Sequence, residues 1–229
     1  MDTKIELVQR VEYIKNACRG RKVLHLGCTN WPYTKEALDN NSLLHLELGE
    51  ITGELWGFDF DQAGLDILAA KGVDKLYRAD LEKLEDVNIT ETFDVIVAGE
   101  MIEHLNNPGL FLRGVQRFMN AETKLIITTV NAYCAFRVLH YGLRGKGGVA
   151  EPVHPDHVAY YSYSTLKLLV ERAGLIVDRF AFYDLGKEHR NTTPWYIKAV
   201  NDICVGISKQ LADGVVAECK IDPKNVKVV

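Results

Sequence analysis

One stretch near the N-terminus constrains the fold more than any other: Lys22-Val23-Leu24-His25-Leu26-Gly27-Cys28-Thr29-Asn30. The apolar run over residues 22–26 predicts a buried strand of a parallel sheet. Gly27 then permits a sharp turn and a close approach to a ligand, because it carries no Cβ. Ligands of open α/β sheets bind beyond the carboxyl ends of the strands. The stretch therefore predicts a strand that ends beneath a binding crevice.

Composition and charge narrow the class of protein. The chain has 229 residues, 47% of them hydrophobic and 25% charged, which suits one globular α/β domain over residues 1–229. A net charge of -4 does not favour a nucleic-acid partner. Five scattered cysteines without a CxxC pair indicate reduced thiols in a cytoplasmic protein. No apolar run has the length of a membrane span, so we expect no stable membrane insertion.

Apolar periodicity predicts alternating helices and strands along the chain. A first helix follows a capping box at residues 3–6 and places Leu7, Val11, Ile14 and Cys18 on one face. Residues 31–50 have a mixed period and are interpreted as helix or loop. After the strand at 22–26, the expected elements are strand 53–59, helix 61–72, strand 75–79, strand 93–99, helix 107–118, strand 124–130, helix 164–174, strand 175–182, helix 193–207 and strand 214–221.

The helices are expected to bury one apolar face each. Asp61 and Ser164 are predicted helix caps, and Ala69 and Leu110 are predicted to face inward with their apolar neighbours. The stripe from Ile197 to Ile207 is predicted to face the core, with a partner or membrane surface as the alternative.

Residues 131–163 break the pattern and are expected to form a loop insertion on the substrate side. The stretch is rich in Gly, His and Tyr, and its aromatic residues argue against disorder. Whether these aromatic residues line an apolar pocket or hold the loop in place is left open.

Polar residues follow the ends of neighbouring predicted strands. Gly27, Asp59 and Asp80 come at three such ends, which lie along one crevice in a doubly wound sheet. A carboxylate at Asp59 can accept from both hydroxyls of a ribose. A carboxylate at Asp80 can accept from an adenine amino group, with the backbone of Leu81 at the ring edge. The fourth strand places Gly99-Glu100-Met101 under the centre of the crevice.

In their order and spacing, several motifs together resemble the class I S-adenosylmethionine-dependent methyltransferases. The stretch from Phe93 to Pro108 is most similar to the small-molecule (type 11-like) branch. The motifs are Val23-Leu24-His25-Leu26-Gly27-Cys28, Gly57-Phe58-Asp59, Arg78-Ala79-Asp80-Leu81, Phe93-Asp94-Val95-Ile96-Val97-Ala98-Gly99-Glu100-Met101-Ile102-Glu103-His104-Leu105 and His154-Pro155-Asp156-His157.

The resemblance implies a Rossmann-like three-layer α/β sandwich. Its doubly wound sheet would have seven strands, mostly parallel, with an antiparallel last strand. It also implies S-adenosyl-L-methionine as cofactor and methyl transfer to an oxygen, or a nitrogen, of a small molecule such as a sugar, lipid precursor or quinone-like compound. The cofactor-binding residues it implies are Gly27, Cys28, Asn30, Asp59, Phe60, Asp80, Leu81, Gly99, Glu100 and Met101.

The first loop departs from the family pattern, acid-x-Gly-x-Gly-x-Gly. His25 stands in place of the acid, while Thr29 and Trp31 replace the second and third glycines. We expect the loop to follow a different path, with Asn30 supplying polar contacts. We interpret the long separation between Gly27 and Asp59 as an insertion after Trp31.

Three histidines are candidates for proton transfer. His104, His154 and His157 lie where a general base or a substrate contact is expected, because imidazole titrates near neutral pH. His104 has a packing role as its alternative, and His25 is expected to be a core residue. His154, Asp156 and His157 have the chemistry of metal ligands. Pro155 excludes a regular helix face, however, and no further ligand is evident, so no metal is expected.

Two other functions fit parts of this pattern. An NAD-dependent oxidoreductase fits Asp59, but the first loop lacks the G-x-G-x-x-G pattern. A non-catalytic S-adenosylmethionine-binding protein or scaffold fits the altered loop. The expected partner is a small-molecule substrate, a homodimer is left open, and the sequence does not identify the acceptor.

Overall fold

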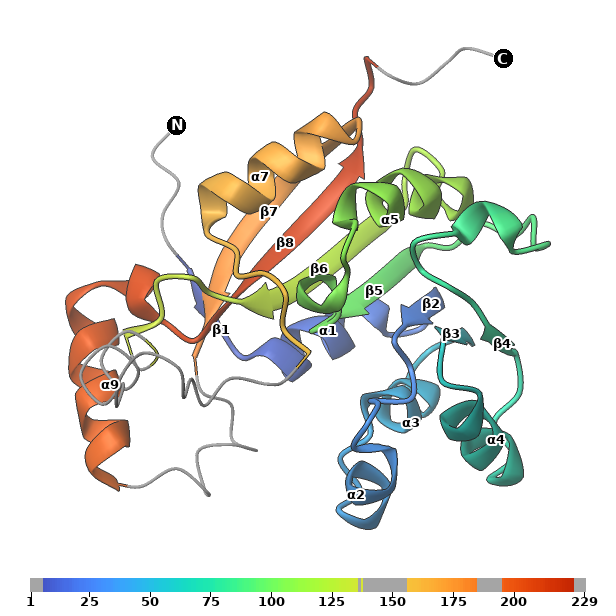
Figure 1. The fold of residues 1–229 in the computed structure, drawn as a ribbon, viewed down its shortest axis with the longest axis horizontal. Coiled ribbons are helices and arrows are strands. Elements are labelled where there is room, and N and C mark those ends of the chain that lie inside the picture. The colour runs from blue at the N-terminus through green and yellow to red at the C-terminus, as the bar shows by residue number, and fades with distance from the viewer. Residues whose placement is uncertain (1–5, 136, 138–155, 185–194, 225–229) are drawn as a thin grey trace.

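An eight-stranded sheet forms the middle layer of the protein (Figure 1). This is a computed structural model, and it describes residues 6–135, 137, 156–184 and 195–224. The strands are β1 Leu7–Val8, β2 Lys22–Leu26, β3 Glu54–Asp59, β4 Leu76–Arg78, β5 Val95–Gly99, β6 Lys124–Val130, β7 Leu175–Tyr183 and β8 Gly214–Ile221. Their order is β1-β7-β8-β6-β5-β2-β3-β4, and β8 runs antiparallel to both β6 and β7. The mostly parallel Rossmann-like sheet with an antiparallel last strand is therefore confirmed.

Helices cover both faces of this sheet. They are α1 Arg10–Cys18, α2 Thr34–Asp39, α3 Leu44–Gly49, α4 Gln62–Ala70, α5 Pro108–Gly114, α7 Tyr163–Arg172 and α9 Trp195–Ile207. Short 3-10 helices are η1 Leu84–Asp86, η2 Ile102–His104, η3 Val115–Phe118 and η4 Lys209–Leu211. The predicted start of the last helix at Thr193-Pro194 lies outside the described residues, as does the loop from 138 to 155.

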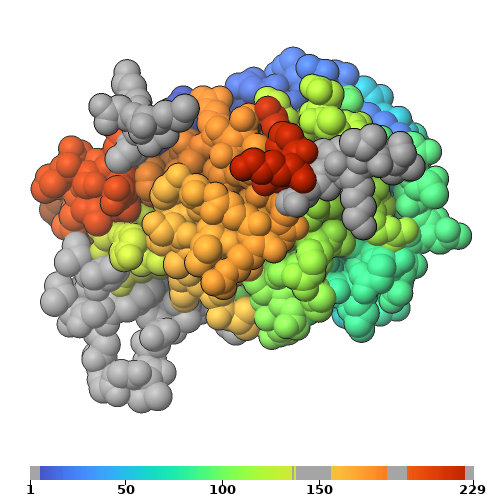
Figure 2. All heavy atoms as spheres, turned by 90° about the horizontal axis from the view of Figure 1, so that it is seen from above, coloured from blue at the N-terminus to red at the C-terminus, as the bar shows by residue number. Residues whose placement is uncertain are grey.

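The strand pattern explains the three layers. Along β5, Val95 and Val97 pack with α1, while Ile96 and Ala98 pack in the core cluster that includes residues of α5 and α7. Both faces of the strand are buried, which is why its sequence is continuously apolar rather than alternating. Figure 2 shows the face that α7 and α5 cover, with the orange atoms of α7 beside the green atoms of α5.

The sheet has eight strands rather than the predicted seven. Leu7 was placed on the first helix by its spacing, but Leu7 and Val8 instead pair with Phe182 and Tyr183 of β7. Helix α1 begins only at Arg10. The prediction was wrong because the unpaired edge of β7 offers hydrogen bonds to the chain that no helical spacing reveals. In the ambiguous stretch 31–50, the structure has two short helices, α2 and α3.

Three further local predictions were wrong. Ser162, not Ser164, caps α7, in a capping box with Thr165. Ala69 is exposed, and so is Leu110, because α4 and α5 bury narrower stripes than expected. The largest difference concerns helix α9, whose apolar stripe was predicted to face the core: Ile203 is 65% and Ile207 80% exposed.

Helix α9 buries a different face from the stripe that the sequence predicted. Asn201 and Val205 are its buried residues, and the helix forms the red-orange edge of the molecule in Figure 2. Asn201 donates to the carboxylate of Asp184 over 2.9 Å, which fixes this face of the helix inward. None of the helices in the described ranges is long and apolar enough to cross a membrane.

Candidate active site

The carboxyl ends of β2, β3 and β5 meet at one edge of the sheet. Leu26 is in register with Phe58 of β3 and with Ala98 of β5. The next residues along these strands, Gly27, Asp59 and Gly99, therefore lie side by side. This is the topological position at which open α/β sheets bind ligands.

Asp59 closes the first loop against β3. One oxygen of its buried carboxylate, Oδ2, accepts from the backbone N–H of Thr29 over 2.8 Å. The other, Oδ1, accepts from the backbone N–H of Asp61 over 3.0 Å. Each carboxylate oxygen has two lone-pair sites, so one site on each oxygen is left for a further donor. Asp59 can thus hold the loop and still accept from a ribose.

Gly27 keeps the space across the crevice open. Its φ of +74° lies in the left-handed region, which glycine adopts without strain. A Cβ at this position would lie 3.6 Å from Cβ of Met101, on the neighbouring strand end. Even the smallest side chain would therefore occupy the space between β2 and β5. This geometry, together with Asp59, fits an adenosyl cofactor.

The first loop compensates for its missing second glycine. Thr29 is buried and packs directly against Gly64 of α4, where an added Cβ would lie 2.6 Å from Cβ of Thr29. The side chain of Asp61 caps α4, accepting from the backbone N–H of Gly64 over 3.0 Å. The glycine absent from the loop therefore has a counterpart on the helix that faces it. Asn30 follows with a φ of +60° and is exposed.

His25 is a core residue, as predicted, and occupies the usual place of the first-loop acid. Its Nδ1 lies 3.2 Å from Nδ1 of His45, and the two rings are stacked. Burial lowers the pKa of His25 well below its usual value, with further lowering by His45 and Arg10. Burial also lowers the pKa of His45, to about 4. A neutral imidazole pair therefore stands where the family usually has a negative charge.

The remaining predicted cofactor residues follow the same edge of the sheet, and their side chains differ in exposure to solvent. Asp80 is half-buried, and its Oδ1 accepts from the backbone N–H of Glu82 over 3.0 Å. Leu81 is buried beside it, and so is Cys28 beneath the loop. Phe60 is exposed, and the Arg78 guanidinium lies 5.1 Å from its ring centroid. Their predicted roles toward a cofactor stay predictions.

Glu100 is held by side chains that the sequence analysis did not connect with it. Its Oε1 accepts from the hydroxyl of Thr128 and from that of Tyr183, each over 2.8 Å. The Tyr183 ring fits because residue 214 is glycine: a Cβ there would lie 1.9 Å from Cζ of the ring. Glu100 itself has a φ of +51°, so its backbone is strained where β5 ends.

Glu103 is a buried acid that sequence reasoning did not select. Its side chain is completely buried, and Oε2 accepts from the hydroxyl of Thr129 over 2.8 Å. Within the described part of the chain, Oε1 has no hydrogen-bond partner. Burial, together with the nearby charge of Glu100, raises the pKa of Glu103 to about 8. The available signal was its position one residue before His104 and three after Glu100.

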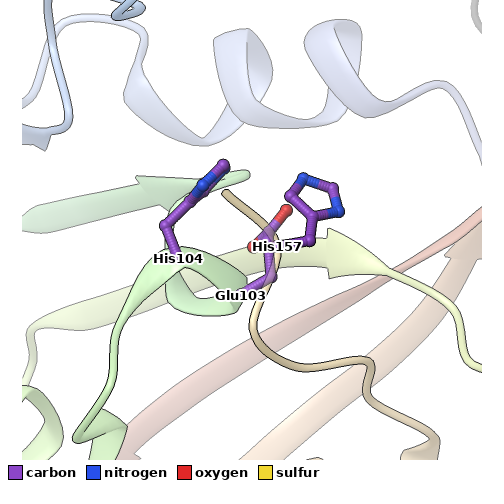
Figure 3. Close-up of side chains that lie close together, drawn as sticks. All are labelled: Glu103, His104 and His157. Atoms are coloured by element: carbon purple, nitrogen blue, oxygen red, sulfur yellow. The ribbon is translucent and has the colours of Figure 1, made fainter. Parts of the chain in front are cut away.

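The rings of His104 and His157 contact each other beside the carboxyl group of Glu103. Their ring centroids are 4.7 Å apart, and the ring planes meet at 80°. The backbone N–H of Val158 donates to the carbonyl oxygen of Glu103 over 2.9 Å, which brings His157 to the end of β5. Figure 3 shows the carboxyl group of Glu103 close to the two imidazole rings. Two of the three predicted catalytic histidines are thus brought together, and His154 lies outside the described residues.

Arg10 is a further residue that the sequence analysis missed. It begins α1, and its guanidinium lies 6.0 Å from the Tyr183 ring centroid. A Cβ on Gly99 would lie 3.9 Å from its Nη1. A positive charge therefore stands beside the carboxyl end of β5.

The fold and the position of the strand-end site are those of doubly wound α/β proteins that bind ligands at a topological switch point. A family model for a methyltransferase domain matches residues 12–179. The chain belongs to this family, the class I S-adenosylmethionine-dependent methyltransferases, and is an enzyme that uses S-adenosyl-L-methionine. The NAD-dependent alternative is therefore excluded.

Individual methyltransferases are similar to this chain in sequence or in fold. The ubiquinone biosynthesis O-methyltransferase of Bradyrhizobium diazoefficiens is 26% identical over 188 residues, which cover 75% of this chain and 74% of that protein. A methyltransferase from Archaeoglobus fulgidus shares the fold, with a TM-score of 0.57 and 18% identity over 92% of this chain and 91% of that one.

A third similarity concerns a structure with a bound product. The magnesium protoporphyrin IX methyltransferase of Synechocystis, solved with S-adenosylhomocysteine, has a TM-score of 0.59. Its identity to this chain is 9%, and the match covers 93% of this chain and 82% of that one. At this level of identity the likeness concerns the fold alone.

Proposed function

We propose that this enzyme transfers a methyl group to a hydroxyl oxygen of a small, quinone-like aromatic molecule. The observation that carries the proposal is the group Glu103, His104 and His157, which stands at the end of β5 beside the cofactor edge. The similarity to a ubiquinone biosynthesis O-methyltransferase supports this class of acceptor.

The cofactor is held by the edge from β2 to β4. Asp59 accepts from the ribose hydroxyls, Asp80 accepts from the adenine amino group, and Gly27 lets the backbone approach the cofactor. Arg10 pairs with the carboxylate of the methionine part, because its charge stands beside Gly99 at the end of β5. When bound, the cofactor supplies a methyl group on a positively charged sulfur.

The residues after β5 act on the acceptor. A hydroxyl must lose its proton as its oxygen attacks, and an amine needs less help. A site with two imidazoles therefore favours oxygen over nitrogen. His104 and His157 receive or direct that proton, while the buried side chains of Met101 and Tyr161 limit access of water. Most of the reaction's barrier is lowered by holding donor and acceptor in line.

The cellular setting is also part of the proposal. We propose a cytoplasmic enzyme with a small-molecule substrate and no nucleic-acid partner. The cysteines, all five of which lie in the described ranges, are free thiols, and this supports a reducing compartment.

The proposal is tested in two steps. Calorimetric titration with S-adenosylmethionine, S-adenosylhomocysteine and NADH should show binding of the first two only. Asp59→Ala should weaken their binding at least about tenfold, since a charged hydrogen bond contributes about 1.5–3 kcal/mol. Asp66→Ala, which removes an exposed acid on α4, is the matched control and should bind as the unaltered enzyme does.

The second step measures methyl transfer to a catechol, a sugar and a carboxylic acid. We expect transfer to the catechol, with His104→Ala losing turnover while it still binds the cofactor. Transfer to the sugar or the acid alone would contradict the proposed acceptor. Equal turnover of His104→Ala and the unaltered enzyme would remove this histidine from the mechanism.

A further inference from the structure

The group of Glu103, His104 and His157 has a property that proton transfer does not require. One nitrogen from each ring and one oxygen of the carboxylate all lie within 4.8 Å of one another. The side chain of Glu103 is completely buried, and its Oε1 has no partner within the described residues. A buried oxygen without a partner costs about 1–3 kcal/mol, so its position calls for a ligand.

The ligand chemistry of these three side chains is specific. Two imidazoles with one carboxylate form the protein ligand set of catalytic zinc sites, which leave a fourth position open. Mg²⁺ and Ca²⁺ prefer oxygen ligands throughout, and two nitrogen ligands disfavour them. We propose that Glu103, His104 and His157 bind one divalent transition-metal ion such as Zn²⁺. This site revises the expectation, drawn from the sequence, that no metal is bound.

The fold supports such a site from two separate segments. Glu103 and His104 belong to η2, while His157 comes from the segment that leads into α7. The bond from Val158 N–H to the Glu103 carbonyl ties the two segments together. Thr129 donates to the other carboxylate oxygen, in the manner of the outer-shell partners that orient metal ligands. Ligands on a tetrahedral zinc ion lie about 3.4 Å apart, so small side-chain rotations close the site.

The role of the ion rests on the proposed function. A hydroxyl oxygen of the acceptor takes the open position, where the ion lowers the pKa of that hydroxyl. The hydroxyl proton passes to solvent. The oxygen's electron pair forms the new O–CH₃ bond as the S–CH₃ bond breaks, and sulfur keeps that bonding pair as a neutral thioether. With the ion bound, His104 and His157 act as its ligands, and the ion takes over the activation of the hydroxyl that the proposed function gives to the metal-free imidazoles.

The test of the site does not depend on methyl transfer. The full chain is freed of metal with a chelator and titrated with Co²⁺, followed by displacement with Zn²⁺ and by calorimetry. We expect one ion per chain, a visible Co²⁺ absorption typical of low coordination number, and no competition by Mg²⁺. Glu103→Gln and His157→Ala should each weaken Zn²⁺ binding at least about tenfold, the smallest loss seen for supporting residues of metal sites. Asp156→Asn, next to His157 but outside the three, is the matched control and should bind Zn²⁺ as tightly as the unaltered chain.

The outcomes separate the site from the activity. Absence of Zn²⁺ binding, or equal binding by the unaltered chain and both ligand variants, would overturn the metal site. Full methyl transfer by chelator-treated enzyme would overturn the role of the ion in the reaction. If the ion binds as expected but S-adenosylmethionine does not, the proposed function fails while the metal site stands.

Discussion

The two halves of this active site are built in different ways. We name the halves for their proposed roles: the cofactor half comprises β2, β3, β4 and the turns that follow them, and the acceptor half comprises β5 to β8 with their connecting segments. The predicted cofactor residues Gly99, Glu100 and Met101 lie where the two halves meet, since β5 pairs with β2. In the cofactor half, backbone groups make the decisive contacts: Asp59 accepts from two N–H groups, and glycines set the turn at Gly27 and the packing at Gly64. In the acceptor half, side chains contact each other, as half-buried Glu100 does with Tyr183 and buried Glu103 with Thr129.

This difference has a consequence for how each half tolerates change. Contacts to backbone groups depend on chain path, so side chains such as Thr29 can vary if a neighbour such as Gly64 makes room. Networks of buried side chains depend on every member, because a group that loses its partner stays buried and unsatisfied. We expect substitutions in the acceptor half to be less easily compensated than those in the cofactor half.

The largest effect is expected at Gly214. In Gly214→Ala, the new Cβ meets the Tyr183 ring at 1.9 Å and forces this ring away from Glu100. We expect a loss of about 3 kcal/mol in the free energy of unfolding, the upper end of the usual cost of overpacking, measured by urea denaturation. Gly206→Ala is the control, since its Cβ meets nothing within 4 Å and α9 gains from alanine. Similar stability of the two variants would show that the Tyr183 contact is dispensable.

A smaller effect is expected at Gly64, and a second substitution at Thr29 should partly reverse it. The Cβ of Gly64→Ala lies 2.5 Å from Oδ2 of the capping residue Asp61 and 2.6 Å from Cβ of Thr29, so we expect a loss of about 1–3 kcal/mol in stability and weaker cofactor binding. Adding Thr29→Gly, which restores the family's glycine, should recover part of both losses. Denaturation and calorimetry on the double-mutant cycle measure this coupling. Simple additivity would mean that loop and helix do not compensate each other.

The neutral pair His25 and His45 predicts a pH dependence of stability. The folded chain keeps both imidazoles neutral, whereas the unfolded chain protonates them below a pKa of about 6.5. The unfolded state therefore binds more protons, and stability falls as the pH drops from about 6.5 toward 4. Between these values, His45→Asn should reduce the slope by roughly 1 kcal/mol per pH unit relative to the unaltered chain. Identical slopes, measured by denaturation at each pH, would mean that the pKa of His45 is not lowered in the folded state.

The smallest effect is expected on α9, in the acceptor half. Ile203→Ser removes an apolar side chain that is 65% exposed and should change stability by less than about 0.5 kcal/mol. Val205→Ser, on the buried side of the same helix, should cost more, because it places a hydroxyl in an apolar contact. Urea denaturation of both variants measures the difference. A large loss for Ile203→Ser would mean that this face is covered in solution.

The sequence predicted the strands of the sheet and the residues at their ends with good accuracy. β2, β5 and β6 are mostly apolar and are buried on both faces, and such a run marks a buried parallel strand without reference to its neighbours. Predictions were wrong where one local sequence pattern was compatible with two structures. Ser162 and Ser164 both suit a helix cap, and Leu7 suits a helix face as well as an edge strand. The apolar stripe of α9 was assigned to the core because periodicity shows which residues share a face but not where that face points.

By itself, the sequence determined the order of strands and helices, the glycine turn at Gly27 and the acids at the strand ends. Each of these follows from backbone preferences within a few residues. Only the tertiary structure decided that Gly64 faces Thr29, that Tyr183 reaches Glu100, and that His157 joins Glu103 and His104. These contacts join segments far apart in the chain, and they form only when packing of the whole sheet brings the segments together. The cofactor half could therefore be derived from the sequence to a large extent, whereas the acceptor half required the fold.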